Sequence, residues 1–586
     1  MKKTIITFLA AGLLLITGLK AQTIQEGKNH LYADRFKSAT GVFEKLLATN
    51  PNNIEATYWL GQTYLEMDEI AGARVATARQ LYEKALLSSA NAPLLLVGMG
   101  HVELRENKTS EAKQRFETAL TMTRTKKGDD QTILTAIGRA NAEAKVGDYN
   151  YAIEKLMAAA DKGEKNPDVF LQLGNAYRKA RPGEGGGDAY KSYKKALDMD
   201  PTFAVADLRL AKLFESQKNW ELFLEYLNDA TKRDPQFSPA YYELFYYYFF
   251  RAKFPEAEEQ LKKYITSKAP ETDIQDEYLY AQLCWARKDF PCAITKAEAV
   301  VSAMKDLTKP KVYRLLTDAY YQNNDFPSAK KYSDLFFAKK NPEDIILPDY
   351  ENRALILSKL GSPVETVYNA YIDGVSVDTT LDAKLDFLKK GAAFFKDQKN
   401  REYEAKILEK VIAMKPTPSI NDLFDLTIAY YFIPDYDKAR NESNFIIQKF
   451  PDEIYGYEWA YNSAVAIALD TTRKISQDTM GFPASYKLYE FTAKDTAKYK
   501  KQYINAVRFL SAYYINEAKD KDKSLEFFRK WLVVDPANAV TIQNYIDQIE
   551  KMPAAKSGST KKGSKPAPSA KPKTVPKVKK GTIVKK

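Results

Sequence analysis

The chain has 586 residues, of which 45% are hydrophobic and 12% aromatic, with 39 tyrosines and 5 tryptophans. This length exceeds one compact domain and leaves either several globular domains or one long repeat array. The net charge is +12, but eleven lysines lie between residues 553 and 586 and three more among the first 20 residues. Without those fourteen lysines the formal charge is −2, so the body of the chain lacks the basic character of a nucleic-acid-binding protein.

Residues 1–21 have the pattern of a secretory signal peptide. Lys2 and Lys3 precede an almost unbroken apolar run from Ile5 to Ile16, and Ala21 ends a plausible cleavage site. The run is shorter than the roughly 20 residues that span a bilayer as a helix, although an uncleaved anchor is the alternative. We therefore expect an exported bacterial protein that resides in the periplasm, either free or associated with the outer membrane.

A fixed spacing of small, large and proline residues recurs from residue 24 to residue 549. In its first copy, Gly27 is followed by His30, Ala39, Phe43 and Pro51. A large residue three positions after a small one lies on the same helix face. The second small residue follows a turn, so two helices can approach closely, and the bulky residue fills the space beside them. Proline then starts the next unit, because it does not continue a helix interior. Further copies are centred on Gly174, Ala211, Thr317 and Thr427.

This pattern resembles the tetratricopeptide repeat (TPR), a helix-turn-helix unit of about 34 residues. The resemblance covers about twelve or thirteen units. It implies an all-α fold, a right-handed superhelical solenoid in which each unit buries its apolar face only against its neighbours.

Departures from the spacing divide the array. We expect an N-terminal array over residues 22–342 and a weak or irregular segment, a possible hinge, over residues 343–383. A C-terminal array is expected over residues 384–552, with an insertion at 470–498 and a capping helix at its end. A flexible loop is expected from Arg181 to Asp188. Residues 553–586 contain mainly Lys, Pro, Ser, Ala and Gly and are expected to be disordered.

The residues of common catalytic and metal sites are scarce. The chain has two histidines, His30 and His101, and two cysteines, Cys284 and Cys292. Neither zinc ligation of ordinary spacing nor a histidine-dependent nucleophile is compatible with this set. We therefore expect no enzyme activity, cofactor or metal. The cysteines, eight residues apart, are compatible with a disulfide across a turn or with two free thiols.

The resemblance implies a binding groove lined by the first helix of each unit. The segment from Tyr241 to Phe250 is rich in Tyr and Phe, which frequently carry interface energy together with Trp and Arg. The alternative is that this segment only fills the core between repeats. The groove residues that the family's positions predict are Tyr242, Tyr246, Phe249, Phe250, Tyr278, Trp285, Arg314, Tyr321, Phe424 and Tyr431.

These features favour a non-catalytic scaffold of the bacterial envelope that organises a protein complex through its groove. The alternative is a cell-wall or polysaccharide-associated factor that uses aromatic stacking and its basic tail. In either case the lysine-rich tail offers contact with anionic surfaces.

Overall fold

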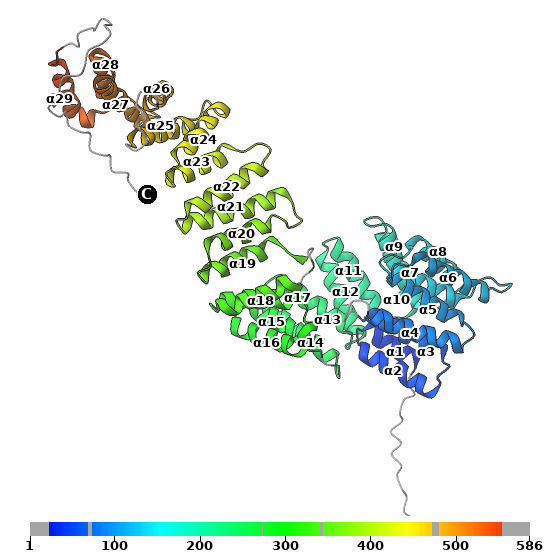
Figure 1. Ribbon diagram of the computed structural model, residues 1–586. Helices are drawn as coiled ribbons and strands as arrows, with labels where there is room; N and C mark the ends of the chain where they lie inside the picture. The colour runs from blue at the N-terminus through cyan, green and yellow to red at the C-terminus, as the bar shows by residue number, and fades with distance from the viewer. Residues whose placement is uncertain are drawn as a thin grey trace, which may run out of the picture. The chain divides into compact units, whose positions relative to one another are not determined.

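A computed structural model describes all residues except 1–22, 68–72, 164, 272, 340, 342–343, 471–479 and 554–586. The predicted signal peptide and basic tail therefore lie outside the described residues, apart from Pro553. The described chain consists of successive α-helices joined by short turns (Figure 1). Adjacent helices pack in pairs, so the predicted all-α solenoid is confirmed. Among the helices described, none is both long and apolar enough to cross a membrane.

The chain divides into two compact units. Among the described residues, unit 1 comprises those up to 344 and 355–362, and unit 2 comprises residues 345–354 and those from 363 onward. The helices of unit 1 are α1 (Ile24–Tyr32), α2 (Phe36–Thr49), α3 (Ile54–Glu66), α4 (Ala73–Ser88), α5 (Pro93–Arg105), α6 (Thr109–Thr123), α7 (Gln131–Glu143), α8 (Tyr149–Asp161), α9 (Pro167–Ala180), α10 (Gly186–Met199), α11 (Ala204–Ser216), α12 (Trp220–Arg233), α13 (Ser238–Phe249), α14 (Phe254–Ser267), α15 (Asp276–Ala286), α16 (Phe290–Met304), α17 (Pro310–Gln322) and α18 (Phe326–Lys339).

The boundary between the units runs through α19 (Leu347–Lys359). Unit 2 continues with α20 (Val364–Gly374), α21 (Leu381–Asp397), α22 (Arg401–Met414), α23 (Ile420–Phe432), α24 (Tyr436–Lys449), α25 (Ile454–Leu469), α26 (Gly481–Thr492), α27 (Lys500–Asn516), α28 (Lys521–Val534) and α29 (Ala539–Glu550). The segment expected to be irregular, residues 343–383, thus contains ordinary helices, and its polar residues lie in the turn between α20 and α21. A hinge there stays a prediction.

Five turns inside the helix pairs share one local design. A residue in the left-handed region ends the first helix, and the next residue accepts a hydrogen bond from a backbone N–H in the first turn of the second helix. Such an N-cap contributes about 1 kcal/mol. These turn pairs are Lys218-Asn219, Lys288-Asp289, Asn324-Asp325, Lys399-Asn400 and Lys519-Asp520.

The small residues of the repeat are the points where paired helices approach most closely. A Cβ atom on Gly27 would lie 2.4 Å from Phe43 Cε1, and one on Gly100 would lie 2.4 Å from Phe116 Cε1. A Cβ atom on Gly174 would likewise lie 2.3 Å from Cε1 of the buried Tyr193 ring. The predicted role of this spacing is therefore confirmed, because the bulky residue occupies the space that the glycine leaves.

The first helix pair also contacts helices far along unit 1. Tyr32 packs edge-on against Phe203, Arg35 Nη1 donates to Gln236 Oε1 at 2.7 Å, and Ser238 Oγ donates to the carbonyl of Ala33 at 2.6 Å. These contacts join α1 to the starts of α11 and α13. The expectation that each repeat buries surface only against its neighbours is therefore wrong for this pair.

Glu271, in the segment after α14, makes a further long-range contact with the first helix pair. Its carboxylate accepts hydrogen bonds from the backbone N–H groups of Lys37, at 3.2 Å, and Ser38, at 2.6 Å. These N–H groups lie in the first turn of α2 and have no acceptor within their own helix. An acidic side chain more than 230 residues away therefore caps α2.

Helices occupy part of two segments that depart from the repeat spacing. Helix α10 begins at Gly186, so the loop expected to reach Asp188 ends at Gly185, where a Cβ atom would lie 2.2 Å from the Tyr177 carbonyl oxygen. Within the predicted insertion at 470–498, residues 471–479 are not described, but α26 forms and packs on α25 and α27. Its Pro483 lies in the first turn, where proline is tolerated.

Candidate partner-binding surfaces

The aromatic residues of α13 divide between the core and the surface of unit 1. Phe245 is fully buried, whereas Tyr242, Tyr246 and Phe249 are half-buried against the same core. Phe250, at the end of this helix, is 77% exposed. The helix therefore fills the core with one face and presents aromatic rings on another, and binding at those rings stays a prediction.

Three predicted groove residues occupy equivalent places near the ends of successive first helices. Phe249, Trp285 and Tyr321 lie on α13, α15 and α17, each 36 residues after the last. Trp285 is 41% exposed, and its indole N–H donates to Asp318 on α17. Phe250 stacks on Tyr246 with ring centroids 5.6 Å apart. We call Phe249, Phe250, Trp285 and Tyr321 the α13–α17 aromatic surface.

Two other predicted groove residues of unit 1 are engaged within the protein. Tyr278 is buried in the core between α15 and α17, so its ring is not available to a partner. Arg314 donates to the carbonyl of Asp344 at 2.5 Å and lies over the Phe336 ring at 4.7 Å. Tyr246 also links helices, because its hydroxyl donates to Gln282 Oε1 on α15 at 3.1 Å.

Unit 2 carries a second aromatic group around α23 and α25. Phe424 and Tyr431 are half-buried, and both contact Trp459. Phe432 and Tyr455 are 53% and 41% exposed beside them. We call these five residues the α23–α25 aromatic surface.

The disulfide of unit 1 adjoins Trp285. Cys284 and Cys292 are joined with a Cα–Cα distance of 5.8 Å, which ties the end of α15 to the first turn of α16. Of the two possibilities open from the sequence, the structure therefore has the bridge. This places a covalent link at the turn next to an exposed tryptophan.

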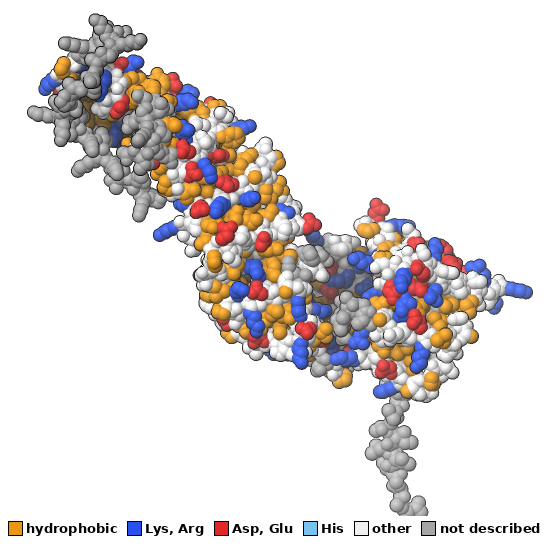
Figure 2. Space-filling model, in the orientation of Figure 1, with side chains coloured by type: hydrophobic (Ala, Val, Ile, Leu, Met, Phe, Trp, Pro, Cys, Tyr) orange, Lys and Arg blue, Asp and Glu red, His pale blue; other side chains and the backbone are white. Residues whose placement is uncertain are grey.

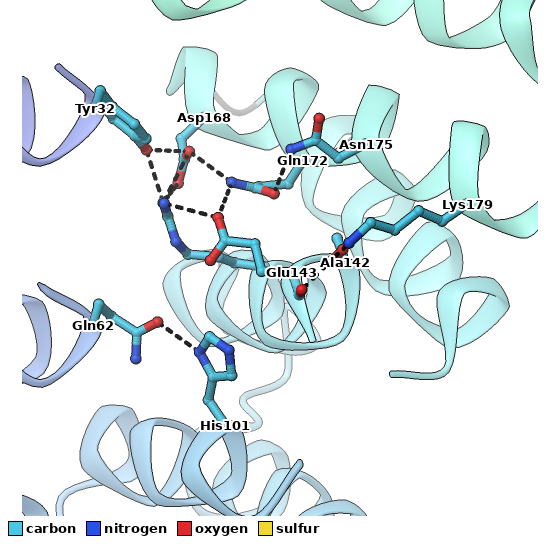
Figure 3. Close-up of polar contacts among 10 residues, drawn as sticks. Tyr32, Gln62, His101, Ala142, Glu143, Asp168, Gln172, Asn175 and Lys179 are labelled. Carbon is cyan, nitrogen blue, oxygen red and sulfur yellow. Dashed lines mark hydrogen bonds and ion pairs between the residues drawn. The ribbon is translucent and has the colours of Figure 1, made fainter. Parts of the chain in front are cut away.

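A polar network in unit 1 was not predicted from the sequence (Figure 3). Arg139, on α7, is buried and bonds Asp168 Oδ2 at 2.9 Å, Glu143 Oε1 at 3.0 Å and the Tyr32 hydroxyl at 2.8 Å. Tyr32 in turn donates to Asp168, and Gln172 donates to Glu143 Oε1 at 2.8 Å. The network thus ties α1 to α7 and α9 through the buried side chains of Arg139 and Asp168.

Burial and charge act against each other on this network. Burial opposes charge on Asp168, yet Arg139 and Lys28 hold its pKa below the usual range. Burial raises the pKa of Glu143 to about 8, with Arg139 offsetting part of the effect. Glu66 lies close enough to share a hydrogen bond with Glu143, which also favours the protonated acid. Glu143 therefore carries a proton at neutral pH, whereas Asp168 is ionised.

The two histidines act as packing residues. His101 is fully buried, its Nδ1 lies 2.8 Å from Gln62 Oε1, and burial lowers its pKa to about 3. His30 is half-buried, and its pKa is also lowered by burial. In the part of the chain that the structure describes, no group of three or more His, Cys, Asp or Glu residues is placed to hold a metal ion.

These pKa values predict how stability changes with pH. The folded state keeps a proton on Glu143 that the unfolded chain, with a carboxyl pKa near 4.5, has already released. Stability due to Glu143 therefore falls as pH rises toward 8. His101 acts oppositely, but only below about pH 6.5, where the unfolded histidine gains a proton. Between pH 6.5 and 8 we expect a loss of about 1–2 kcal/mol, because one proton corresponds to at most about 1.4 kcal/mol per pH unit.

Urea unfolding at pH 6.5 and at pH 8, measured on the wild type and on Glu143→Gln, tests this expectation. Glutamine keeps the shape of the side chain and does not titrate, so the variant should lose the dependence on pH over this interval. An equal pH slope in both proteins would contradict the assignment to Glu143.

On the face that Figure 2 shows, basic and acidic side chains of the described residues are interspersed among hydrophobic ones. This agrees with the nearly neutral body of the sequence. Candidate binding positions are therefore distinguished by exposed rings or by local groups of one charge.

The tetratricopeptide repeat family matches the chain at residues 42–75 and again at residues 187–245. No curated protein sequence matches it. Several solved structures are similar. The C-terminal part of a TPR repeat-containing protein from Cytophaga hutchinsonii is 26% identical, over 47% of this chain and all of that one, with a TM-score of 0.28. A tetratricopeptide repeat protein from Parabacteroides merdae is 19% identical, over 42% of this chain and 92% of that one, with a TM-score of 0.33. Yeast Tom70 is 15% identical, over 70% and 94%, with a TM-score of 0.30.

Proposed function

Because the chain is a tetratricopeptide repeat protein, we propose that it is a non-catalytic scaffold that binds other proteins through the α13–α17 aromatic surface. The observation that carries this proposal is the exposure of Phe250 and Trp285, at 77% and 41%, beside further aromatic rings. Large exposed rings on a packed aromatic base are typical of positions that contribute most to interface energy. The α23–α25 aromatic surface is a second position of the same kind.

We further propose that the protein works in the bacterial envelope as part of a larger complex. The apolar segment from Ile5 to Ile16 supports export, and the disulfide between Cys284 and Cys292 supports an oxidising compartment. The scarcity of histidine supports a role without catalysis. The lysines between residues 553 and 586 are suited to contact with anionic surfaces of that compartment.

Replacing both exposed rings tests the proposal. We expect Phe250→Ser with Trp285→Ala to lower the affinity for a partner, captured by crosslinking in intact cells, at least tenfold. The physical reason is that both side chains would be buried in the complex, whereas their removal from the free protein changes stability little.

Leu87→Ser provides the matched control. Leu87 is 90% exposed on α4, away from the aromatic surface, so this variant should bind as the wild type does. Partner binding that survives the double variant would contradict the proposal. Retention on purified cell wall, without a protein partner, would instead favour the polysaccharide-associated alternative.

A further inference from the structure

Unit 1 contains a cavity with an excess of unpaired basic side chains. An inner compartment of about 400 Å³ is lined by residues of α3, α7, α9, α10 and α11, and an outer one of about 890 Å³ adjoins it. The two compartments share Glu143, Arg178 and Lys179. We call the two together the basic cavity.

Five basic residues surround the basic cavity: Arg105, Lys145, Arg178, Lys179 and Arg209. None of them forms an ion pair with an acidic residue of the described chain. Lys179 Nζ donates to the backbone carbonyls of Ala142 and Glu143, and Arg178 Nη2 donates to the carbonyl of Lys212. The Nε of Arg209 is buried and has no hydrogen-bond partner.

Neighbouring basic residues of the same unit are paired. Arg139 bonds Asp168 at 2.9 Å and Lys212 bonds Glu243 at 2.8 Å. Unit 1 therefore pairs charges close to the basic cavity and leaves those around it without a direct ion pair, although Arg209 still acts on the buried Asp34, and Glu66 and Glu143 act on Lys179. A buried donor without a partner is costly, so a ligand that supplies the acceptor is favoured.

The acids of the basic cavity do not balance its cations. Glu66 and Glu143 are its only lining acids among the described residues. Because burial raises the pKa of Glu143 to about 8, this residue is neutral near pH 7. Five cations then face one carboxylate, which makes the basic cavity attractive to negative charge.

We propose that the basic cavity binds an acidic peptide segment of a partner protein. This inference rests on the proposed protein-binding function and names the chemistry of one partner segment. The combined volume is much larger than a single carboxylate or phosphate. Leu104, Tyr149 and Pro182 add apolar surface to the outer compartment, as a peptide with side chains of both kinds requires. Arginines are suited to the acidic side chains because their planar donors match carboxylates.

Fluorescence anisotropy with a defined probe tests the inference on the full mature chain. The probe is a fluorescein-labelled ten-residue peptide of alternating Glu and Ala, and its control has Gln in place of each Glu. The Glu peptide should bind at least tenfold more tightly than the Gln peptide, and less tightly as salt rises. A phosphoserine peptide and inorganic phosphate, used as competitors, distinguish carboxylate from phosphate as the preferred group.

Variants place the binding in the basic cavity. Arg178→Gln with Arg209→Gln should weaken binding of the Glu peptide at least tenfold. Lys191→Gln with Lys218→Gln removes the same charge from exposed positions outside it and should change the affinity less than twofold. The single variant Arg209→Gln removes a cation whose Nε has no hydrogen-bond partner, so it tests the site even if the double variant folds poorly.

Equal binding by both double variants would overturn the inference, as would tighter binding of an alginate oligosaccharide than of the Glu peptide. Neither result bears on the aromatic surface, because Phe250→Ser with Trp285→Ala tests that proposal against a different ligand. Failure of the cavity and failure of the scaffold are therefore distinguishable.

Discussion

Arg139→Leu is expected to lower the free energy of unfolding of unit 1 by about 3–5 kcal/mol. Arg139 is 3% exposed, pairs with the Asp168 carboxylate and also contacts Glu143. Its removal leaves the buried Asp168 carboxylate without its ion-pair partner and with only the weaker effect of Lys28, which costs more than the ion pair contributes in the intact protein. The Tyr32 hydroxyl also loses a donor, so α1 should separate more readily from α9.

Urea unfolding measures this loss, and hydrogen exchange over residues 24–49 reports the release of the first helix pair. Arg139→Leu combined with Asp168→Asn should lose less than the sum of the two single changes, because no unpaired charge remains. Arg529→Leu serves as control, since Arg529 is exposed and its ion pair with Glu550 contributes at most about 1 kcal/mol. A loss below 1 kcal/mol for Arg139→Leu would show that the network does not stabilise unit 1.

Gly174→Val is expected to destabilise unit 1 by about 3 kcal/mol. Even a Cβ atom at this position would lie 2.3 Å from Tyr193 Cε1. The Tyr193 ring is fully buried and its hydroxyl donates to Asn175 Oδ1 at 3.0 Å, so it cannot move aside without losing packing and a hydrogen bond. Overfilling a packed core in this way usually costs 1–3 kcal/mol, and a β-branched side chain lies at the upper end.

Gly41→Ala is the control for this substitution and should have the opposite sign. Gly41 is also helical, on α2, but no atom lies within 4 Å of the place of its Cβ. Alanine should therefore stabilise the helix by about 0.5–1 kcal/mol. Thermal unfolding of both variants tests the pair. A neutral Gly174→Val would contradict the role assigned to the small repeat position.

The helix pairs were predictable because their defining contacts are local. Gly27 and Phe43 lie 16 residues apart in the sequence and meet inside one pair, so a regular spacing records the contact. The contacts that join the first helix pair to distant helices of unit 1 leave no such regular spacing in the sequence. Tyr32 and Asp168 are 136 residues apart, and neither residue type nor spacing distinguishes that pair from others on the sequence.

The aromatic surface was predictable only in part. Positions on the first helix of a repeat identified Phe250 and Trp285, which are exposed, and also Tyr278, which is buried. One face of a helix meets both the groove and the next repeat, and side-chain packing decides which rings remain accessible. Arg139 was not predicted from the sequence. Its position between Gly138 and Ala140 was a usable signal, because a charged residue among small packing residues indicates a buried ion pair.

Site-specific photo-crosslinking in cells tests the scaffold claim most directly. A photoreactive phenylalanine analogue replaces Phe250 in one variant and Leu87 in the other, both at exposed positions. We expect a stoichiometric adduct with one protein partner from position 250 and little or none from position 87. Equal adducts from both positions, or none with any protein from position 250, would contradict binding at the α13–α17 aromatic surface.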